Sequence, residues 1–190
     1  MEIRKTKPEE LEVLLKMYEH ARRFMATHGN ASQWENNYPS PQLILDDITE
    51  GNSYVCTEQD QIIATFYYKE GADPTYMRIY DGDWINDSRY GVVHRITSTG
   101  NVKGAASFCL NWALEQCGNI RIDTHRDNIV MQHLLDKNGF KYCGIVARLA
   151  RRFARWSASR QQTDSAPCRD RKSTRLNSSH VKRSRMPSSA

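Results

Sequence analysis

The sequence has no long apolar run, no export signal and no closely spaced pair of cysteines. No stretch reaches the roughly 18 apolar residues that a membrane helix needs, so we expect no contact with a membrane. The charged start, MEIRKTKPEE, argues against a signal peptide. The five cysteines are irregularly spaced and include no CxxC pair, so we expect no metal site. An odd cysteine count without an export signal favours a cytoplasmic protein with reduced, buried thiols.

Negative charge is scarce at the C-terminal end of the chain. The 190 residues carry a formal net charge of +5. Residues 147–190 hold 12 of the 27 Lys and Arg but only two of the 22 Asp and Glu, so residues 1–146 carry a net charge of −5. A basic protein would suggest a nucleic-acid partner, but here the positive excess lies wholly in the last segment. We therefore expect an acidic protein body and no nucleic acid.

The last residues, 170–190, resemble translated laboratory sequence. Residues 170–180 can be encoded, codon by codon, by the constant part of a common sequencing-library adapter. Residues 184–190 can be encoded by the continuation of the same adapter after a variable index. We interpret 170–190 as an adapter-derived, disordered tail and leave it out of the fold prediction.

The hydrophobic pattern predicts an α/β (α+β) fold in which strands and helices alternate within one domain. Residues 70–90 lack such a pattern and are expected to form a loop-rich insertion. The alternation in the second half indicates helices layered on a sheet. The expected strands are 2–5, 53–58, 61–69, 91–98, 120–125 and 140–146, and the expected helices run from a capping box at Thr6–Glu9 to Gly29, from Ser40 to Gly51, and over 104–117 and 128–137.

Small residues begin the helix that follows strand 91–98. The stretch ITSTGNVKGAA, residues 96–106, reads as a strand end, a loop and a helix start. The first turn of a helix presents unpaired N–H groups at the positive end of its dipole, which suits a phosphate. Small side chains at Gly104, Ala105 and Ala106 would let the anion approach the backbone. Tight packing would also explain small residues, so this stretch alone leaves both interpretations open.

A second motif follows one strand and one helix later. The stretch DTHRDN at 123–128 leads into a helix that ends in NGF at 138–140. The two motifs together resemble those of the GNAT superfamily of acyl-CoA-dependent N-acetyltransferases. The family's Gln/Arg-x-x-Gly-x-Gly/Ala motif aligns on residues 101–106, and its later Asn…Gly-Phe motif aligns on residues 128–140. The resemblance covers about residues 2–146 and implies a mixed central sheet flanked by helices.

The resemblance implies acetyl-CoA as the co-substrate. Its pantetheine arm would enter between strands 91–98 and 120–125 and pair with backbone groups near Ile96, one of which would polarise the thioester carbonyl. The side chain of Asn128 would bind the cofactor arm, cap its helix, or do both. The pyrophosphate would be held by the backbone of Asn101, Val102, Lys103, Gly104, Ala105, Ala106 and Ser107, with Lys103 adding charge at the rim.

Direct transfer to an amine would require a base beside the cleft. The resemblance makes Asp123 the first candidate, although Arg121 or Arg126 could instead hold it as an ordinary surface carboxylate. His125 shares its strand face and is the second candidate. We interpret His94 as structural. The family's usual acidic Tyr is replaced here by Leu135, so no general acid is assigned.

The resemblance also implies an acceptor site lined by the loop between the first two helices. Trp34 and Glu35 from that loop, with Tyr76 and Trp84 from the insertion, are the candidate acceptor residues, although each aromatic could equally anchor its loop. Acidic loop residues would suit a small cationic amine. A non-catalytic acyl-CoA-binding module and an inactive truncated product remain alternatives, and a homodimer stays open.

The family's fold closes with a hairpin, and the sequence shows only its first strand. After residue 146 no second alternating run follows, so we expect a frame change near Ala147 and a missing last strand. The domain would then end at residue 146, with an out-of-frame segment at 147–169. The alternative is a genuine C-terminal helix, because Leu149, Phe153 and Trp156 have a loose helical spacing.

Overall fold

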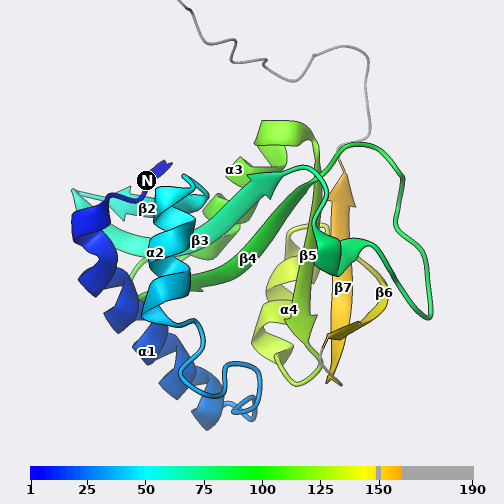
Figure 1. The fold of residues 1–190 in the computed structure, drawn as a ribbon, viewed down its shortest axis with the longest axis horizontal. Helices are drawn as coiled ribbons and strands as arrows, with labels where there is room; N and C mark the ends of the chain where they lie inside the picture. The colour runs from blue at the N-terminus through cyan, green and yellow to red at the C-terminus, as the bar shows by residue number, and fades with distance from the viewer. Residues whose placement is uncertain (149–150, 160–190) are drawn as a thin grey trace, which may run out of the picture.

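A seven-stranded mixed sheet organises the computed structural model, which describes residues 1–148 and 151–159. The strand order is β1-β2-β3-β4-β5-β7-β6, and only the β4–β5 pair is parallel. The expected mixed sheet flanked by helices is confirmed (Figure 1). The strands are β1 (Glu2–Lys5), β2 (Ser53–Glu58), β3 (Gln61–Glu70), β4 (Gly91–Ser98), β5 (Asn119–His125), β6 (Lys141–Arg148) and β7 (Arg151–Ser159).

Within the described residues, four α-helices cover the two faces of the sheet: α1 (Leu11–Thr27), α2 (Pro41–Thr49), α3 (Ala105–Cys117) and α4 (Ile129–Lys137). Neighbouring residues of β2 point to opposite faces and enter different hydrophobic clusters. Val55 packs with residues of α1 and α2, whereas Cys56 belongs to a larger cluster with α3, α4 and β5. The sheet therefore separates a small core under α1 and α2 from a large core under α3 and α4.

The start of the first helix differs from the predicted capping box. A short 3-10 turn, η1 (Pro8–Glu10), precedes α1, and the Glu10 carboxylate accepts a hydrogen bond from the Lys7 backbone N–H at 2.8 Å. The Thr6 hydroxyl instead pairs with the Ser53 hydroxyl at 2.7 Å, which ties β1 to β2. The capping box assigned to Thr6–Glu9 is therefore wrong by one residue, because tertiary contact takes up the Thr6 side chain.

The expectation that the last strand is missing is wrong. Residues 151–159 form β7, which inserts between β5 and β6 and pairs with both. The C-terminal helix considered as an alternative is likewise not formed in this segment. Polar and apolar residues alternate only over residues 155–159, a short run that follows the consecutive cations Arg151 and Arg152. That is why a search for period-2 alternation missed it.

The C-terminal boundary follows from this strand. Residues 141–148 and 151–159 are part of the sheet, so the fold extends beyond residue 146 into the segment expected to be out of frame. The frame change near Ala147 stays a prediction. Residues 160–190, including the adapter-like 170–190, lie outside the described residues.

The insertion between β3 and β4 is largely loop, as expected, with one 3-10 turn, η2 (Pro74–Tyr76). Part of it covers the outer edge of β6, because Tyr80 and Ile145 exchange two backbone hydrogen bonds of 2.7 Å. A covered edge is protected from pairing with other chains. The insertion thus closes one side of the sheet and places η2 beside β5.

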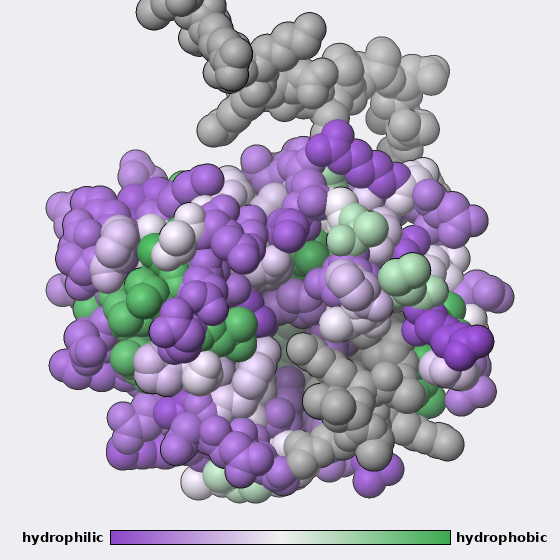
Figure 2. Space-filling view, in the orientation of Figure 1, coloured by the Kyte–Doolittle hydropathy of each residue, from purple (hydrophilic) through white to green (hydrophobic). Residues whose placement is uncertain are grey.

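Figure 2 shows a mostly hydrophilic face, on which hydrophobic side chains gather over α1 and α2. No helix in residues 1–148 is long and apolar enough to cross a membrane. The four cysteines of the described chain are free thiols, and three of them are buried. The expectation of buried thiols is therefore confirmed for Cys56, Cys109 and Cys143.

Removal of β7 is expected to abolish the fold. A chain ending at Arg148 would leave β5 and β6 without the strand that joins them, because β7 pairs with each along its length. Far-UV circular dichroism during urea titration should show no cooperative transition for this chain. The control is a chain ending at Ser159, which keeps every strand of the sheet and should unfold cooperatively. Cooperative unfolding of the shorter chain would contradict the prediction.

Candidate active site

The site begins where strands β4 and β5 separate. Only Gly91, Val92 and Val93 pair with β5, opposite residues 120–122, and the two strands then diverge. Figure 1 shows β4 running toward α1 and β5 toward α4, so that the two strands diverge. The separation expected between these two strands is therefore present.

A bulge in β4 sits just beyond the last paired residue. Thr65 pairs with Thr97 and Tyr67 pairs with His94, so the single residue Phe66 faces two residues of β4. Arg95, one of these two, has φ +52°, a left-handed conformation that side-chain-bearing residues rarely adopt. A bulge leaves one residue out of the ladder and redirects the strand. The strained bulge therefore marks the wall of the opening.

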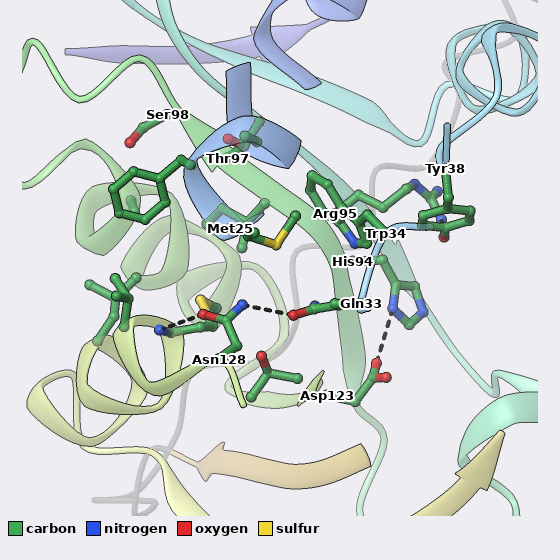
Figure 3. A pocket seen from close by; sticks show the side chains of 18 of the residues that line it. Met25, Gln33, Trp34, Tyr38, His94, Arg95, Thr97, Ser98, Asp123 and Asn128 are labelled. Atoms are coloured by element: carbon green, nitrogen blue, oxygen red, sulfur yellow. Dashed lines mark hydrogen bonds and ion pairs between the residues drawn. The ribbon is translucent and has the colours of Figure 1, made fainter. Parts of the chain in front are cut away.

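The opening leads into a cavity of about 600 Å³. Its wall combines α1, the segment between α1 and α2, β4, β5 and α4. Figure 3 shows charged and aromatic side chains at one end, around His94 and Tyr38, and Asn128 and Ser98 toward the other. The cavity is therefore polar and charged at the end that lies near the insertion.

The opposite end of the cavity is open around the start of α3. Gly100 and Gly104 have φ of +79° and +84°. Apart from atoms of neighbouring residues in the chain, no heavy atom lies within 4 Å of where a methyl side chain would lie at either position. Gly104 is the N-cap of α3, so the free N–H groups of the first helical turn follow it directly. Space and N–H donors at a helix start fit a phosphate group. The residues present therefore fit the group that the sequence predicts there.

Asn128 joins the two sides of the cavity. Its Oδ1 accepts a hydrogen bond from the Met131 backbone N–H at 3.1 Å, which makes it the N-cap of α4. Its Nδ2 donates to Oε1 of Gln33 at 2.9 Å (Figure 3), and Asn30 Nδ2 donates to the same oxygen at 2.6 Å. The capping role predicted for Asn128 is therefore present, and its amide also holds the segment between α1 and α2.

A cluster of ionisable side chains lies at the other end. His94 places Nε2 at 3.0 Å from Asp73 and Nδ1 at 3.4 Å from Asp123. The Tyr76 hydroxyl donates to the same Asp123 oxygen at 2.8 Å. Burial lowers the pKa of His94, but contacts with Asp123 and Asp73 outweigh burial and raise this pKa above its usual 6.5. Burial opposes the shift at Asp73 too, but hydrogen bonds from His94 and Thr75 hold the pKa of that carboxyl well below its usual range.

Arg95 forms a second buried charge pair next to His94. Its Nη2 lies 2.5 Å from Asp47 Oδ2, and its Nη1 donates to the Tyr38 hydroxyl at 3.2 Å. The guanidinium also lies over the Tyr67 ring, 4.8 Å from its centroid. Burial raises the pKa of Asp47 in spite of the arginine. The charge of Arg95 is thus largely neutralised by Asp47, which ties β4 to α2.

Sequence comparison gives no relative, but structural comparison does. No protein-family model and no curated protein matches the sequence. A GNAT-family acetyltransferase from Streptococcus agalactiae 2603 is 30% identical, with a TM-score of 0.78, and the match covers 85% of this chain and 96% of the other. The chain belongs to the GNAT family of acetyltransferases. The prediction of an acetyltransferase is thereby confirmed.

Two more distant proteins share the GNAT fold. A GNAT-family acetyltransferase from Listeria monocytogenes 4b F2365 is 15% identical, with a TM-score of 0.61, covering 83% of this chain and 94% of the other. A Salmonella typhimurium protein solved with acetyl-CoA as its cofactor is 12% identical, with a TM-score of 0.57, covering 87% and 96%. At these identities the likeness extends to the fold alone.

The residues predicted to bind the GNAT cofactor lie along the cavity and beyond its α3 end. Ile96, Ala106 and Asn128 line the cavity. Ser107 accepts a hydrogen bond from Asn138 Nδ2 at 3.0 Å, which ties α3 to the end of α4. The remaining predicted residues lie in the loop and first turn at the start of α3: Asn101, Val102, Lys103, Gly104 and Ala105.

The residues predicted to bind the acceptor are separated by the fold. Trp34 and Glu35 line the cavity. Tyr76 is fully buried behind the site, where its hydroxyl donates to Asp123 and its ring lies against His94. Trp84 lies outside the cavity wall, where the Arg121 guanidinium lies over its ring, with Cζ 4.1 Å from the ring centroid. The insertion therefore supports the site from behind, while the segment between α1 and α2 forms its surface.

Of the two predicted bases, Asp123 lines the cavity and His125 lies outside its wall. His125 accepts a hydrogen bond from the Asp127 backbone N–H at 3.3 Å. Leu135, at the position of the usual acid, is fully buried in the large core. Sequence reasoning treated His94 as structural and did not identify Asp73, because only the folded insertion brings Asp73 to β4.

Loss of Asp47 is expected to destabilise the protein. Asp47→Ala would leave the Arg95 guanidinium, whose side chain is 9% exposed, without its counter-ion. Removing one partner of a buried pair costs about 3–5 kcal/mol of unfolding free energy. The control is Asp46→Ala on the same helix, which removes only an exposed contact with Gln42. Urea unfolding of both variants measures the difference, and equal losses would contradict the buried-pair assignment.

Proposed function

We propose that this GNAT protein transfers an acetyl group from acetyl-CoA directly to the amine of a small cationic acceptor. The observation that carries the proposal is the arrangement of one cavity between the diverging strands. A helix start suited to an anion lies at one end, and a carboxylate–imidazole cluster lies at the other. These are the two features that a transfer between a phosphorylated donor and an amine would need.

The donor would be held mainly by backbone groups. The N–H groups following Gly104 would bind the pyrophosphate, and Lys103, which is exposed at the rim, would add charge. Backbone groups near Ile96, released from the ladder by the bulge, would pair with the pantetheine arm. Asn128 would contribute its amide from α4. The Salmonella relative solved with acetyl-CoA supports this choice of donor.

Asp123 would be the proton acceptor in this reaction. Its carboxylate would take a proton from the acceptor ammonium, directly or through water. The amine nitrogen would then attack the carbonyl carbon of the acetyl-CoA thioester. The carbon–sulfur bond would break, and the leaving thiolate would accept the second amine proton. The products are an acetamide and a thiol, and Asp123 returns its proton to solvent. A backbone N–H near Ile96 would stabilise the developing oxyanion.

The acceptor would be cationic because carboxylates outnumber cations at its end of the cavity. Asp73 and Asp123 flank His94, Asp47 neutralises Arg95, and Glu35 lines the wall as well. Such a cavity attracts and retains ammonium groups. Trp34, which packs edge-on against Tyr18, would give the acceptor an apolar surface.

A non-catalytic acyl-CoA-binding protein is the second candidate. The observation in its favour is Leu135, which stands in the core where the family places its acidic tyrosine. Thiol release in the presence of amines separates the two candidates, because a binding protein would bind acetyl-CoA without releasing thiol. A cytoplasmic location and a homodimer remain predictions.

The anion site is expected to need the glycine at the start of α3. Gly104→Ala would place a methyl group where the phosphate is proposed to approach and should weaken CoA binding about tenfold, or 1.4 kcal/mol. Gly118→Ala is the matched control, because Gly118 ends the same helix with φ +75° and equally open space. Both variants carry the same backbone strain. Isothermal titration calorimetry with CoA compares them, and equal affinities would remove the anion site from Gly104.

The base is expected to be required for turnover. Asp123→Asn should lower kcat on a panel of amines by about 10²–10⁴-fold, the usual contribution of a general base. Thiol release measures turnover, and calorimetry with CoA should show unchanged donor binding. Wild-type turnover by the variant across the pH range would refute the base. No thiol release by the wild type with any amine would refute the enzymatic proposal.

A further inference from the structure

One imidazole ring lies between two carboxylates at the acceptor end of the cavity. His94 contacts Asp73, from the segment before η2, through Nε2 at 3.0 Å, and Asp123, from β5, through Nδ1 at 3.4 Å. The three side chains are 12%, 17% and 7% exposed. Figure 3 shows the His94 ring directed at Asp123 across the opening between β4 and β5. The two strands that separate to form the site are therefore bridged by this ring.

The bridge requires two N–H donors on the ring. Only the imidazolium carries a proton on both nitrogens, whereas neutral imidazole has one donor and one acceptor. An acceptor nitrogen facing a carboxylate oxygen at this distance is repelled. Loss of one proton from His94 therefore breaks one of its two carboxylate contacts.

Asp73 is placed to keep the remaining proton. It is the closer of the two carboxylates, and its Oδ1 is fixed by the backbone N–H and hydroxyl of Thr75 at 2.8 and 2.6 Å. A fixed anion close to Nε2 favours the tautomer that is protonated there. The contact that is lost is then the one between Nδ1 and Asp123.

We propose that His94 and Asp73 are positioning residues for Asp123, and that competition between the two carboxylates for one proton makes the site lose its order as the pH rises through the titration of His94. The proposal rests on the role of Asp123 as the base. Below the titration of His94, the imidazolium holds Asp123 from β4. Above it, Asp73 keeps the remaining proton and the candidate base loses this support.

The other titratable and charged groups around His94 are Tyr67, Tyr76 and Arg95. Burial, more than its charged neighbours, raises the pKa of Tyr67 to about 12. The Tyr76 ring, from η2, lies tilted against the His94 ring, with centroids 5.5 Å apart, and Arg95 follows His94 on β4. Arg95 disfavours the imidazolium, but it is itself paired with Asp47 from α2. The two carboxylates are thus the dominant partners of the ring.

The direction of the pH effect follows from the raised pKa of His94. A histidine whose folded pKa is raised contributes stability that is complete below its unfolded pKa, near 6.5. That contribution is lost as the pH rises through the folded value. The site is therefore ordered below the titration of His94 and loses this contribution above it.

The test is the isosteric variant Asp73→Asn. Its side-chain oxygen can still accept from Thr75, while its NH₂ group would donate to Nε2 and so fix the single proton of neutral His94 on Nδ1, facing Asp123. Nuclear magnetic resonance should show a lower titration midpoint for His94 in the variant. The carboxyl carbon of Asp123 should change shift at the His94 midpoint in the wild type and no longer do so in the variant.

Activity provides the second readout. At each pH, kcat/KM of the variant is divided by kcat/KM of the wild type. The titration of the acceptor amine affects both values equally and so drops out of this ratio. This ratio should rise on the order of tenfold as the pH passes the wild-type His94 midpoint, since small displacements of a reacting group carry penalties of this size or larger. Asp83→Asn, an exposed change in the same insertion, should give a ratio that is constant with pH.

An unchanged His94 midpoint in Asp73→Asn, or an Asp123 signal that ignores His94 in the wild type, would overturn the proposal. So would an activity ratio that does not vary with pH. If Asp73→Asn fails to fold, Asp73→Ser keeps the helix cap, removes the competing carboxylate and should give the same results. Absence of thiol release with every amine would refute the proposed function instead, and the two resonance measurements would still decide the inference.

Discussion

The site depends on one parallel strand pair that stops after three residue pairs. Beyond Val93 and Ile122, β4 and β5 take different partners, since β4 continues with β3 and β5 continues with β7. Each strand therefore keeps one paired edge and exposes the other to the cavity. Backbone groups on an exposed edge need partners, and a ligand lying between the strands can supply them. The parallel pair thus creates a binding surface whose shape is set by the sheet.

The bulge at Arg95 explains how two charged neighbours on one strand come to serve the same cavity. In a regular strand, His94 and Arg95 would point to opposite faces of the sheet. The left-handed conformation of Arg95 breaks this alternation, and both residues line the cavity. Each then meets a carboxylate from a different element, Asp123 and Asp47 respectively. The strain at one residue is thus offset by two buried charge pairs.

Local motifs made part of the site predictable, and tertiary contacts made the rest inaccessible to sequence reasoning. The helix start at Gly104 and the cap at Asn128 depend on neighbouring residues, so their spacing could be recognised. Asp73 reaches His94 only because the insertion folds over β5 and β6, and no spacing encodes that contact. β7 was missed for another reason: its polar–apolar alternation covers only residues 155–159, and its pairing with β5 is a long-range contact.

The two halves of the site are built from different parts of the chain and meet at few side chains. The proposed donor end comes from the turn into α3 and the start of α4, whereas the proposed acceptor end is lined by the segment between α1 and α2 and supported from behind by the insertion. Gln33 joins these halves, because its amide oxygen holds Asn128 of α4. The acceptor segment can therefore change its other side chains, such as Glu35, without altering the donor end. Under the proposed function, this separation would let one fold keep its donor while its acceptor changes.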